Sequence, residues 1–268
     1  MSFKLALCQS AGKNDKDERM RKAEKLVREA ADEGAQVISL PEMWNCPYSN
    51  DYFRPYAEPA DGPSVSFMSD LARDLGIYLI GGSIAELDGD KVYNTSFSFD
   101  PKGEIIGRHR KVHLFDIDVE GGIRFMESDT LTAGEDMTIL DTEFCKIGVA
   151  ICYDVRFPEW FRKMALAGAK LIVLPAAFNM TTGPAHWDLT MRARALDNQV
   201  YFAANAPARD VEGEYVAYGN SCIVSPWGDF IAHGGHEEEI VYGDIGLDKV
   251  EAVRQQLPLL KHRRPELY

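Results

Sequence analysis

The chain has 268 residues, 46% of them hydrophobic and 26% charged, which excludes global disorder and allows a sizeable core without disulfide or metal staples. The net charge of −13 disfavours nucleic acid and anionic membranes as partners, because both attract a basic surface. Five scattered cysteines without a Cys-x-x-Cys pair argue against a disulfide framework and a structural zinc site, and they favour the reducing cytoplasm.

The N-terminal residues predict a strand, a helix and a second strand. Residues 3–9 alternate as a strand rather than a signal peptide, and no apolar run approaches the ~20 residues of a membrane span. Apolar residues spaced by three and four predict an amphipathic helix over 16–34, capped by Asn14 or Asp15 and ended by Gly34. Residues 37–40 form a short strand that is apolar except for Ser39.

The segment that contains the second predicted strand is repeated later in the chain. The segment Gly34-Ala-Gln-Val-Ile-Ser-Leu-Pro41 matches Gly168-Ala-Lys-Leu-Ile-Val-Leu-Pro175 almost position for position, and each copy follows a predicted helix. The match suggests an internal duplication with two similar halves around one sheet core. Similar physical demands on two strands are the alternative explanation.

The remaining segments mix strands and helices without a linker or low-complexity run, which predicts one α/β domain over residues 1–268 whose helices cover sheets with antiparallel pairs. Turn residues separate most of the strands. Strands are expected at 78–85, 92–100, 104–110, 137–141, 145–151, 200–205, 222–225, 230–232 and 240–244, and helices at 158–167, 187–196 and 247–256. Trp227-Gly228 is expected to form a hairpin turn.

Cys152 is a candidate nucleophile because of its position between two predicted elements. An apolar strand runs directly into it, and Pro158 suits the first turn of a helix a few residues later. At such a junction a side chain projects from a rigid sheet edge, and the following backbone N–H groups can point at an oxyanion. A buried core cysteine is the alternative interpretation.

Glu42 and Lys111 are the candidate base and cation for this thiol. Glu42 follows Leu40-Pro41 at a strand end, where open α/β sheets place their sites, and a partly desolvated carboxylate there has a raised pKa suited to accepting a proton. Lys111 follows a predicted strand, and its charge would favour a thiolate and an oxyanion. A solvated loop glutamate, a basic surface patch and a pairing of Cys152 with His186 are the alternatives.

Together these stretches resemble the nitrilase (carbon–nitrogen hydrolase) superfamily, which uses a Glu–Lys–Cys triad in the order found here. The motifs are Leu40-Pro41-Glu42, Arg110-Lys111-Val112-His113 and Ile151-Cys152-Tyr153-Asp154, and the resemblance extends from the first strand to Ile245. It implies an α-β-β-α sandwich with mixed sheets, at least a homodimer formed through sheet-flanking helices, and no metal or organic cofactor. It also implies that Glu127 supports the triad lysine.

Within the superfamily the sequence is most similar to omega-amidases, which release ammonia from 2-oxoglutaramate or 2-oxosuccinamate. Three segments carry this similarity, residues 113–118, 177–187 and 196–200. Deaminated-glutathione amidases share the elements at 156–159 and 182–187, so these do not separate the two groups. A carbon–nitrogen hydrolase for a carbamoyl amine or a nitrile, a catalytically silent binding protein, and a redox sensor with Cys46 as resolving thiol are the other hypotheses.

The resemblance and the residue types predict a small amide as substrate and assign its contacts. Glu42 takes the proton of Cys152, and Lys111 and the Tyr153 backbone N–H hold the oxyanion. Arg156, four residues after the nucleophile, can pair with a remote carboxylate, the alternative being a structural ion pair with Glu159. The residues expected to line or close the pocket are Phe178, Thr182 and Tyr48, whereas His186 and Trp187 are expected to pack at a helix start.

Overall fold

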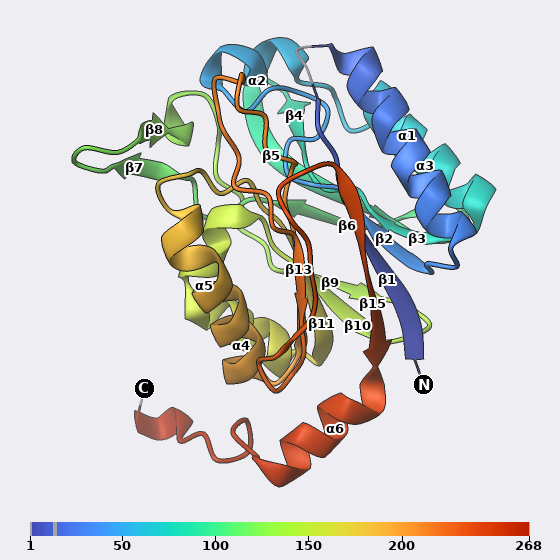
Figure 1. The fold of residues 1–268 in the computed structure, drawn as a ribbon, viewed down its shortest axis with the longest axis vertical. Coiled ribbons are helices and arrows are strands. Elements are labelled where there is room, and N and C mark those ends of the chain that lie inside the picture. Colours follow the sequence, from blue (N-terminus) through green and yellow to red (C-terminus); the bar gives the residue numbers. More distant parts are fainter. Residues whose placement is uncertain (1, 13–14, 268) are drawn as a thin grey trace.

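Two mixed β-sheets lie face to face at the centre of the computed structural model, which describes residues 2–12 and 15–267 (Figure 1). The first sheet has the order β15 (Glu239–Gly246), β1 (Ser2–Gln9), β2 (Val37–Ser39), β3 (Tyr78–Ile80), β5 (Lys91–Phe99) and β4 (Ile84–Asp88), with β6 (Ile105–Arg110) paired to β5. The second has the order β14 (Phe230–His233), β13 (Cys222–Val224), β12 (Tyr201–Asn205), β11 (Ala169–Pro175), β10 (Lys146–Val149) and β9 (Thr138–Asp141).

The two sheets repeat one pattern of pairing. The repeated segments form β2 and β11, and each is the middle of three parallel strands, β1-β2-β3 and β10-β11-β12. Antiparallel strands flank both triplets, β15 and β5 in the first sheet and β9 and β13 in the second. The backbone enters each copy through a glycine with positive φ, 82° at Gly34 and 101° at Gly168. The pattern of parallel and antiparallel pairing along six strands is therefore the same in both sheets, although the outer strands, such as β15 and β9, stand at different places in the chain order.

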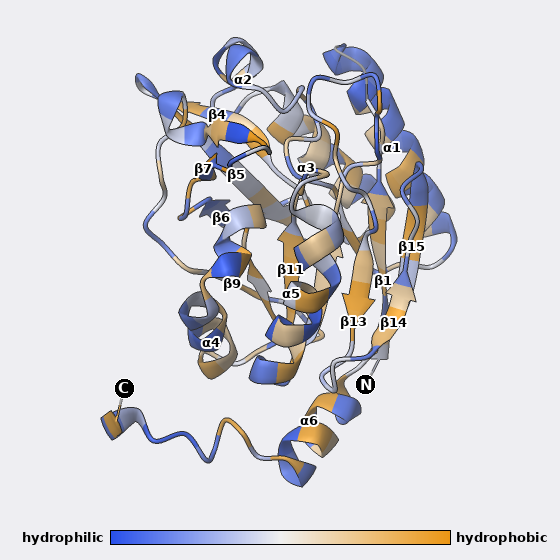
Figure 2. Ribbon diagram, turned by 60° about the vertical axis from the view of Figure 1, so that its left-hand side comes forward, coloured by the Kyte–Doolittle hydropathy of each residue, from blue (hydrophilic) through white to orange (hydrophobic). Residues whose placement is uncertain are grey.

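Helices cover the outer face of each sheet, which confirms the predicted α-β-β-α sandwich. The helices α1 (Lys16–Asp32) and α3 (Pro63–Leu75) pack on the first sheet, and α4 (Pro158–Leu166) and α5 (Gly183–Asn198) on the second. Successive side chains of β1 point to opposite faces of the sheet, as its sequence predicted. Leu5 and Leu7 face the other sheet, whereas Ala6 and Cys8 face the helices. Figure 2 shows the hydrophobic colour concentrated on the inner strands and the hydrophilic colour on the exposed side of α1.

Several predicted boundaries hold, and Asp15 caps α1 by accepting a hydrogen bond from the Glu18 N–H at 2.7 Å. Asn14, the other candidate cap, lies outside the described residues. The predicted hairpin turn at Trp227-Gly228 is confirmed, with a Gly228 φ of 88°. The helix α6 (Leu247–Gln256) forms as expected and leads into a C-terminal segment that extends from the sandwich (Figure 1). None of the described helices is long and apolar enough to cross a membrane.

Other boundaries were wrong or missed. The strand predicted over 78–85 is two strands, β3 and β4, because the chain breaks at Gly82, whose φ is 58° and where any Cβ would collide with the Pro41 carbonyl. The close approach places the β3–β4 turn against the loop that carries Glu42. The helix predicted over 187–196 begins earlier, at Gly183. Four elements went unpredicted: α2 (Asn50–Tyr56), α3, β7 (Asp116–Asp118) and β8 (Arg124–Met126).

Candidate active site

Cys152 stands at the sharp junction between β10 and α4 that its sequence position predicted. Ile151 is extended, Cys152–Arg156 form a single 3₁₀ turn, and α4 begins at Pro158. The φ of Cys152 is +44°, a left-handed conformation that costs a non-glycine residue about 1–2 kcal/mol. The side chain is 3% exposed. A strained, nearly enclosed thiol at a strand end is the arrangement expected of a positioned nucleophile.

Asp154 fixes this junction and was not identified from the sequence. Its buried carboxylate accepts hydrogen bonds from the backbone N–H of Ile151 (3.0 Å) and of His113 (2.9 Å). The ring nitrogens of His113 and His109 lie 2.8 and 3.2 Å from it. Although burial opposes ionisation, the contacts with His109 and His113 hold the pKa of Asp154 below its usual range. The carboxylate therefore ties the Cys152 turn to the segment that carries Lys111.

Lys111 lies between two carboxylates in the interior. Its Nζ is 3.0 Å from Glu42 Oε1 and 2.9 Å from Glu127 Oε1, and all three side chains are at most 2% exposed. Glu42 follows β2, Lys111 follows β6, and Glu127 opens a 3₁₀ turn after β8. The structure thus brings together the three residues that the sequence assigned to one site, from segments up to 85 residues apart (127 minus 42).

The charges of this cluster define its resting protonation. Burial raises the pKa of Glu42, with Lys111 acting in the opposite direction. Burial would lower the pKa of Lys111, but Glu127 and Glu42 hold it well above its usual value. Burial and the neighbouring Glu42 raise the pKa of Cys152 well above that of a free thiol. These shifts favour the protonated form of the Cys152 thiol and the charged form of Lys111.

Backbone and side-chain donors orient both carboxylates. Asn94 Nδ2 donates to Glu42 Oε1 at 2.8 Å, and the Ala177 N–H donates to Glu42 Oε2 at 2.7 Å. The Tyr48 hydroxyl donates to Glu127 Oε1 at 2.7 Å. Ala177 directly follows the residue that matches Glu42 in the second copy of the repeated module, so the equivalent strand end of one half holds the carboxylate of the other. Asn94 and Ala177 were not identified from the sequence.

Arg156, the candidate contact for a substrate carboxylate, ends the 3₁₀ turn that begins at Cys152. The guanidinium of Arg156 lies 4.9 Å from the centre of the Phe178 ring, and its Nη1 is 3.0 Å from His186 Nδ1. Arg156 makes no ion pair with Glu159 or another carboxylate within residues 2–12 and 15–267, which contradicts the structural alternative. His186 is exposed and pairs with Arg156, which contradicts its assignment as the base for Cys152.

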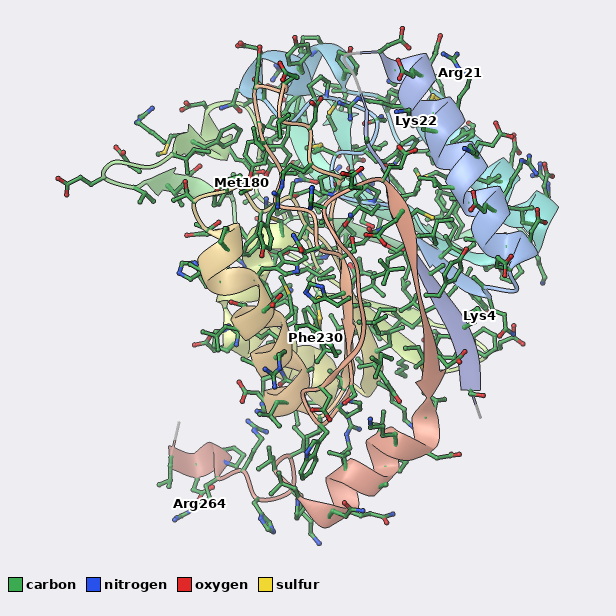
Figure 3. The ribbon with its side chains drawn as sticks, in the orientation of Figure 1. Lys4, Arg21, Lys22, Met180, Phe230 and Arg264 are labelled. Carbon is green, nitrogen blue, oxygen red and sulfur yellow. The ribbon has the colours of Figure 1, made fainter. Side chains whose placement is uncertain are left out.

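The remaining candidates lie in the segments that follow Cys152 and β11. Phe178 is 4% exposed and packs edge-on against Trp187 at 5.1 Å, the packing role expected of Trp187. The Tyr153 ring contacts Phe115 at 5.2 Å. Thr182 immediately precedes α5. Met180, labelled in Figure 3, is exposed at the same end of the molecule, near the β7–β8 hairpin.

A cavity of about 80 Å³ reaches the cluster from the outside. Its lining includes Glu42, Tyr48, Ala177 and Tyr215. Tyr215, which was not identified from the sequence, stacks on Tyr48 with ring centres 4.5 Å apart and donates to the Ala177 carbonyl at 2.5 Å. All five cysteines are free, and Cys46 also lines this cavity. Within the described part of the chain, no group of three His, Cys, Asp or Glu side chains could hold a metal ion.

Comparison with known proteins identifies the family. The sequence model of the carbon–nitrogen hydrolase family matches residues 4–255. The chain belongs to this family. Among curated proteins, omega-amidase NIT2 of Xenopus tropicalis is 51% identical over 266 residues, which are 99% of this chain and 96% of that protein.

Solved structures of carbon–nitrogen hydrolases share the fold. Nit3 of Saccharomyces cerevisiae, a member of branch 10 of the nitrilase superfamily, superposes with a TM-score of 0.91 at 43% identity, over 98% of this chain and 97% of that one. An amidase from Nesterenkonia sp. superposes with a TM-score of 0.81 at 27% identity, over 99% and 98% of the two chains. A glutamate-to-glutamine mutant of that amidase carries acrylamide added at its active-site cysteine. The predicted superfamily and its sandwich fold are therefore confirmed.

Proposed function

We propose that this carbon–nitrogen hydrolase is an omega-amidase. It hydrolyses the terminal amide of small omega-amido keto acids, 2-oxoglutaramate and 2-oxosuccinamate, to a dicarboxylic keto acid and ammonia. The observation that carries the chemistry is the buried Glu42–Lys111–Glu127 cluster beside the strained Cys152 turn. The sequence is 51% and 49% identical to omega-amidase NIT2 of Xenopus tropicalis and of Homo sapiens over almost its full length, which supports this substrate class.

In the first half of the reaction, Glu42 accepts the Cys152 proton as the sulfur attacks the amide carbon. The raised pKa of Glu42 suits this role, because a base works best when its pKa approaches the working pH. The carbonyl oxygen gains a negative charge, which Lys111 Nζ and the Tyr153 backbone N–H stabilise. Glu42 then returns the proton to the departing nitrogen, the C–N bond breaks, ammonia leaves, and a thioester to Cys152 remains.

In the second half, water hydrolyses the thioester. Glu42 removes a proton from the water as its oxygen attacks the carbonyl carbon, and the same oxyanion contacts are used again. The C–S bond breaks, the acid product leaves, and the proton on Glu42 returns to the sulfur. Glu127 keeps Lys111 charged and in place, since its carboxylate lies 2.9 Å from Nζ and is itself held by Tyr48 and by the Phe115 N–H at 2.7 Å.

Ammonia release from 2-oxoglutaramate by the purified protein tests the proposal. A panel with deaminated glutathione, a carbamoyl amine and a nitrile separates the competing hydrolases, and we expect the highest kcat/KM on 2-oxoglutaramate. A higher value on deaminated glutathione would reassign the substrate within the same chemistry. Turnover of none of these compounds, with reversible oxidation of Cys152, would favour the redox sensor instead.

Arg156 is proposed to bind the remote carboxylate of the substrate. The guanidinium lies over Phe178 without an acidic partner among the described residues, so its charge is available to a ligand. Arg156→Lys keeps the charge but loses the planar two-point contact. We expect KM for 2-oxoglutaramate to rise roughly tenfold with a smaller change in kcat, as for the loss of a charge-assisted hydrogen bond. Steady-state kinetics check this, and an unchanged KM would remove Arg156 from the substrate site.

We also propose that the protein forms a homodimer through α4 and α5. These helices expose large apolar side chains, Leu166 at 50%, Leu189 at 71% and Leu196 at 39%. Large apolar side chains that are exposed on these two helices would become buried in such an interface. The cytoplasm is the proposed location, because five free cysteines suit a reducing compartment.

A further inference from the structure

Asn179 lies beside the cavity that reaches Glu42, because its backbone pairs with that of Ala217, which lines the cavity. Asn179 is 4% exposed. Its Oδ1 accepts hydrogen bonds from the backbone N–H of Thr181 at 2.9 Å and of Thr182 at 3.0 Å, and from the Thr182 hydroxyl at 3.3 Å. Three donors on one atom determine which way the amide group faces. Its Nδ2 has no hydrogen-bond partner within the described residues, which is unusual for a buried donor.

The segment that carries Asn179 also holds part of the candidate site, since the Ala177 N–H, two residues earlier, donates to Glu42 at 2.7 Å. Asn179 follows Phe178, whose ring lies beneath the Arg156 guanidinium. Tyr215, whose hydroxyl donates to the Ala177 carbonyl at 2.5 Å, lines the same cavity as Glu42. Burial raises the pKa of that hydroxyl, Cys152 and Glu42 raise it further, and a hydrogen bond from the Asn179 amide lowers it. An amide nitrogen carries two hydrogens, so a contact with Tyr215 still leaves one for a ligand.

We propose that Asn179 Nδ2 donates a hydrogen bond to the 2-oxo oxygen of the substrate. The inference rests on the proposed omega-amidase function and identifies the residue that recognises the 2-oxo group of the substrate. A keto oxygen only accepts hydrogen bonds, and the end of the Asn179 amide that the Thr181–Thr182 turn leaves unoccupied carries only donors. Free glutamine has an ammonium group at the same carbon. The N–H groups of that ammonium would face the N–H group of Asn179, so glutamine would bind poorly. The contact therefore explains how an amidase of this class would act on keto acids while sparing amino acids.

The test compares two substrates that differ only at the 2-oxo group. Glutaramate has the carbon chain, the carboxylate and the amide of 2-oxoglutaramate but lacks the keto oxygen. Asn179→Asp keeps the acceptor for Thr181 and Thr182 and removes the donor. Its added charge repels the carboxylate of both substrates alike, so the informative quantity is the ratio of their kcat/KM values. We expect this ratio, 2-oxoglutaramate over glutaramate, to fall roughly 10- to 100-fold from its wild-type value.

Two further variants keep the result interpretable. Asn179→Ser retains a short acceptor for the turn without an added charge, and it should lower the ratio in the same direction. Asn198→Asp is the matched control, a buried asparagine at the end of α5 whose Nδ2 donates to the Arg194 carbonyl, and it should leave the ratio unchanged.

The outcomes separate this inference from the function on which it rests. A wild-type protein that hydrolyses 2-oxoglutaramate, combined with an unchanged ratio in both Asn179 variants, would overturn the keto contact alone. Equal losses on both substrates would assign Asn179 to the carboxylate or to the fold, and would overturn the contact as well. A wild-type protein that releases ammonia from neither substrate would overturn the proposed function and the inference together.

Discussion

Cys152→Ala is expected to reduce ammonia release from 2-oxoglutaramate by roughly 10⁴-fold or more, as the loss of a covalent nucleophile does in other hydrolases. The thioester to Cys152 cannot form without its sulfur. The variant should remain folded, because the alanine methyl fits inside the space that the thiol leaves. Ammonia release and thermal unfolding measure the two quantities separately.

A companion substitution tests the strain at this position. Cys152→Gly should be as inactive as Cys152→Ala but more stable by about 1 kcal/mol, because glycine accepts the φ of +44° without the Cβ penalty. Urea unfolding of the two variants gives the difference. If alanine is as stable as glycine, the turn is not strained. If either variant retains near-normal turnover while folded, Cys152 is not the nucleophile.

The positions of the reacting groups could be predicted because they depend on local pattern. An apolar strand that ends at Cys152, and a Leu-Pro strand end that carries Glu42, place both side chains at the carboxyl ends of strands. Lys111 and Glu127 required the family resemblance, because nothing in a basic cluster or a short loop distinguishes a buried ion pair from a solvated one. The unpredicted helix α3 had a usable signal in Gly62-Pro63 at its start and Gly76 at its end.

The groups that hold the reacting residues in place could not be predicted, because their roles arise only after the two halves meet. Asn94 is a polar residue in a strand with several buried small polar neighbours, and its bond to Glu42 joins positions 52 residues apart. Ala177 acts through its backbone N–H, which carries no side-chain signal. Asp154 could have been suspected from its place two residues after the nucleophile, but its histidine contacts come from β6 and the segment that follows β6.

Lys111→Met is expected to affect stability and turnover together. The cation lies within 3.0 Å of Glu42 and Glu127, both buried, and its removal leaves their charges uncompensated. Breaking a buried ion pair from one side costs about 3–5 kcal/mol of folding free energy. Removing one oxyanion donor also lowers kcat by roughly 10²- to 10³-fold. Urea unfolding and steady-state ammonia release measure the two losses.

The loss of stability in Lys111→Met should depend on pH in a defined direction. Burial already raises the folded-state pKa of Glu42, and without Lys111 that pKa rises further. A carboxyl whose folded-state pKa exceeds its unfolded value, about 4.3, binds a proton more tightly in the folded state, so stability falls as pH rises through that window. The deficit relative to the wild-type protein should therefore be larger at about pH 8 than at about pH 5.

A second substitution separates the electrostatic cost from the catalytic one. Lys111→Met combined with Glu127→Gln removes one of the two buried charges, and the double variant should regain much of the stability at neutral pH. It should not regain turnover, because the oxyanion donor is still absent. A stability deficit that is the same at both pH values, or that Glu127→Gln does not relieve, would mean that Lys111 contributes packing rather than charge. Recovery of turnover in the double variant would instead remove Lys111 from the oxyanion site.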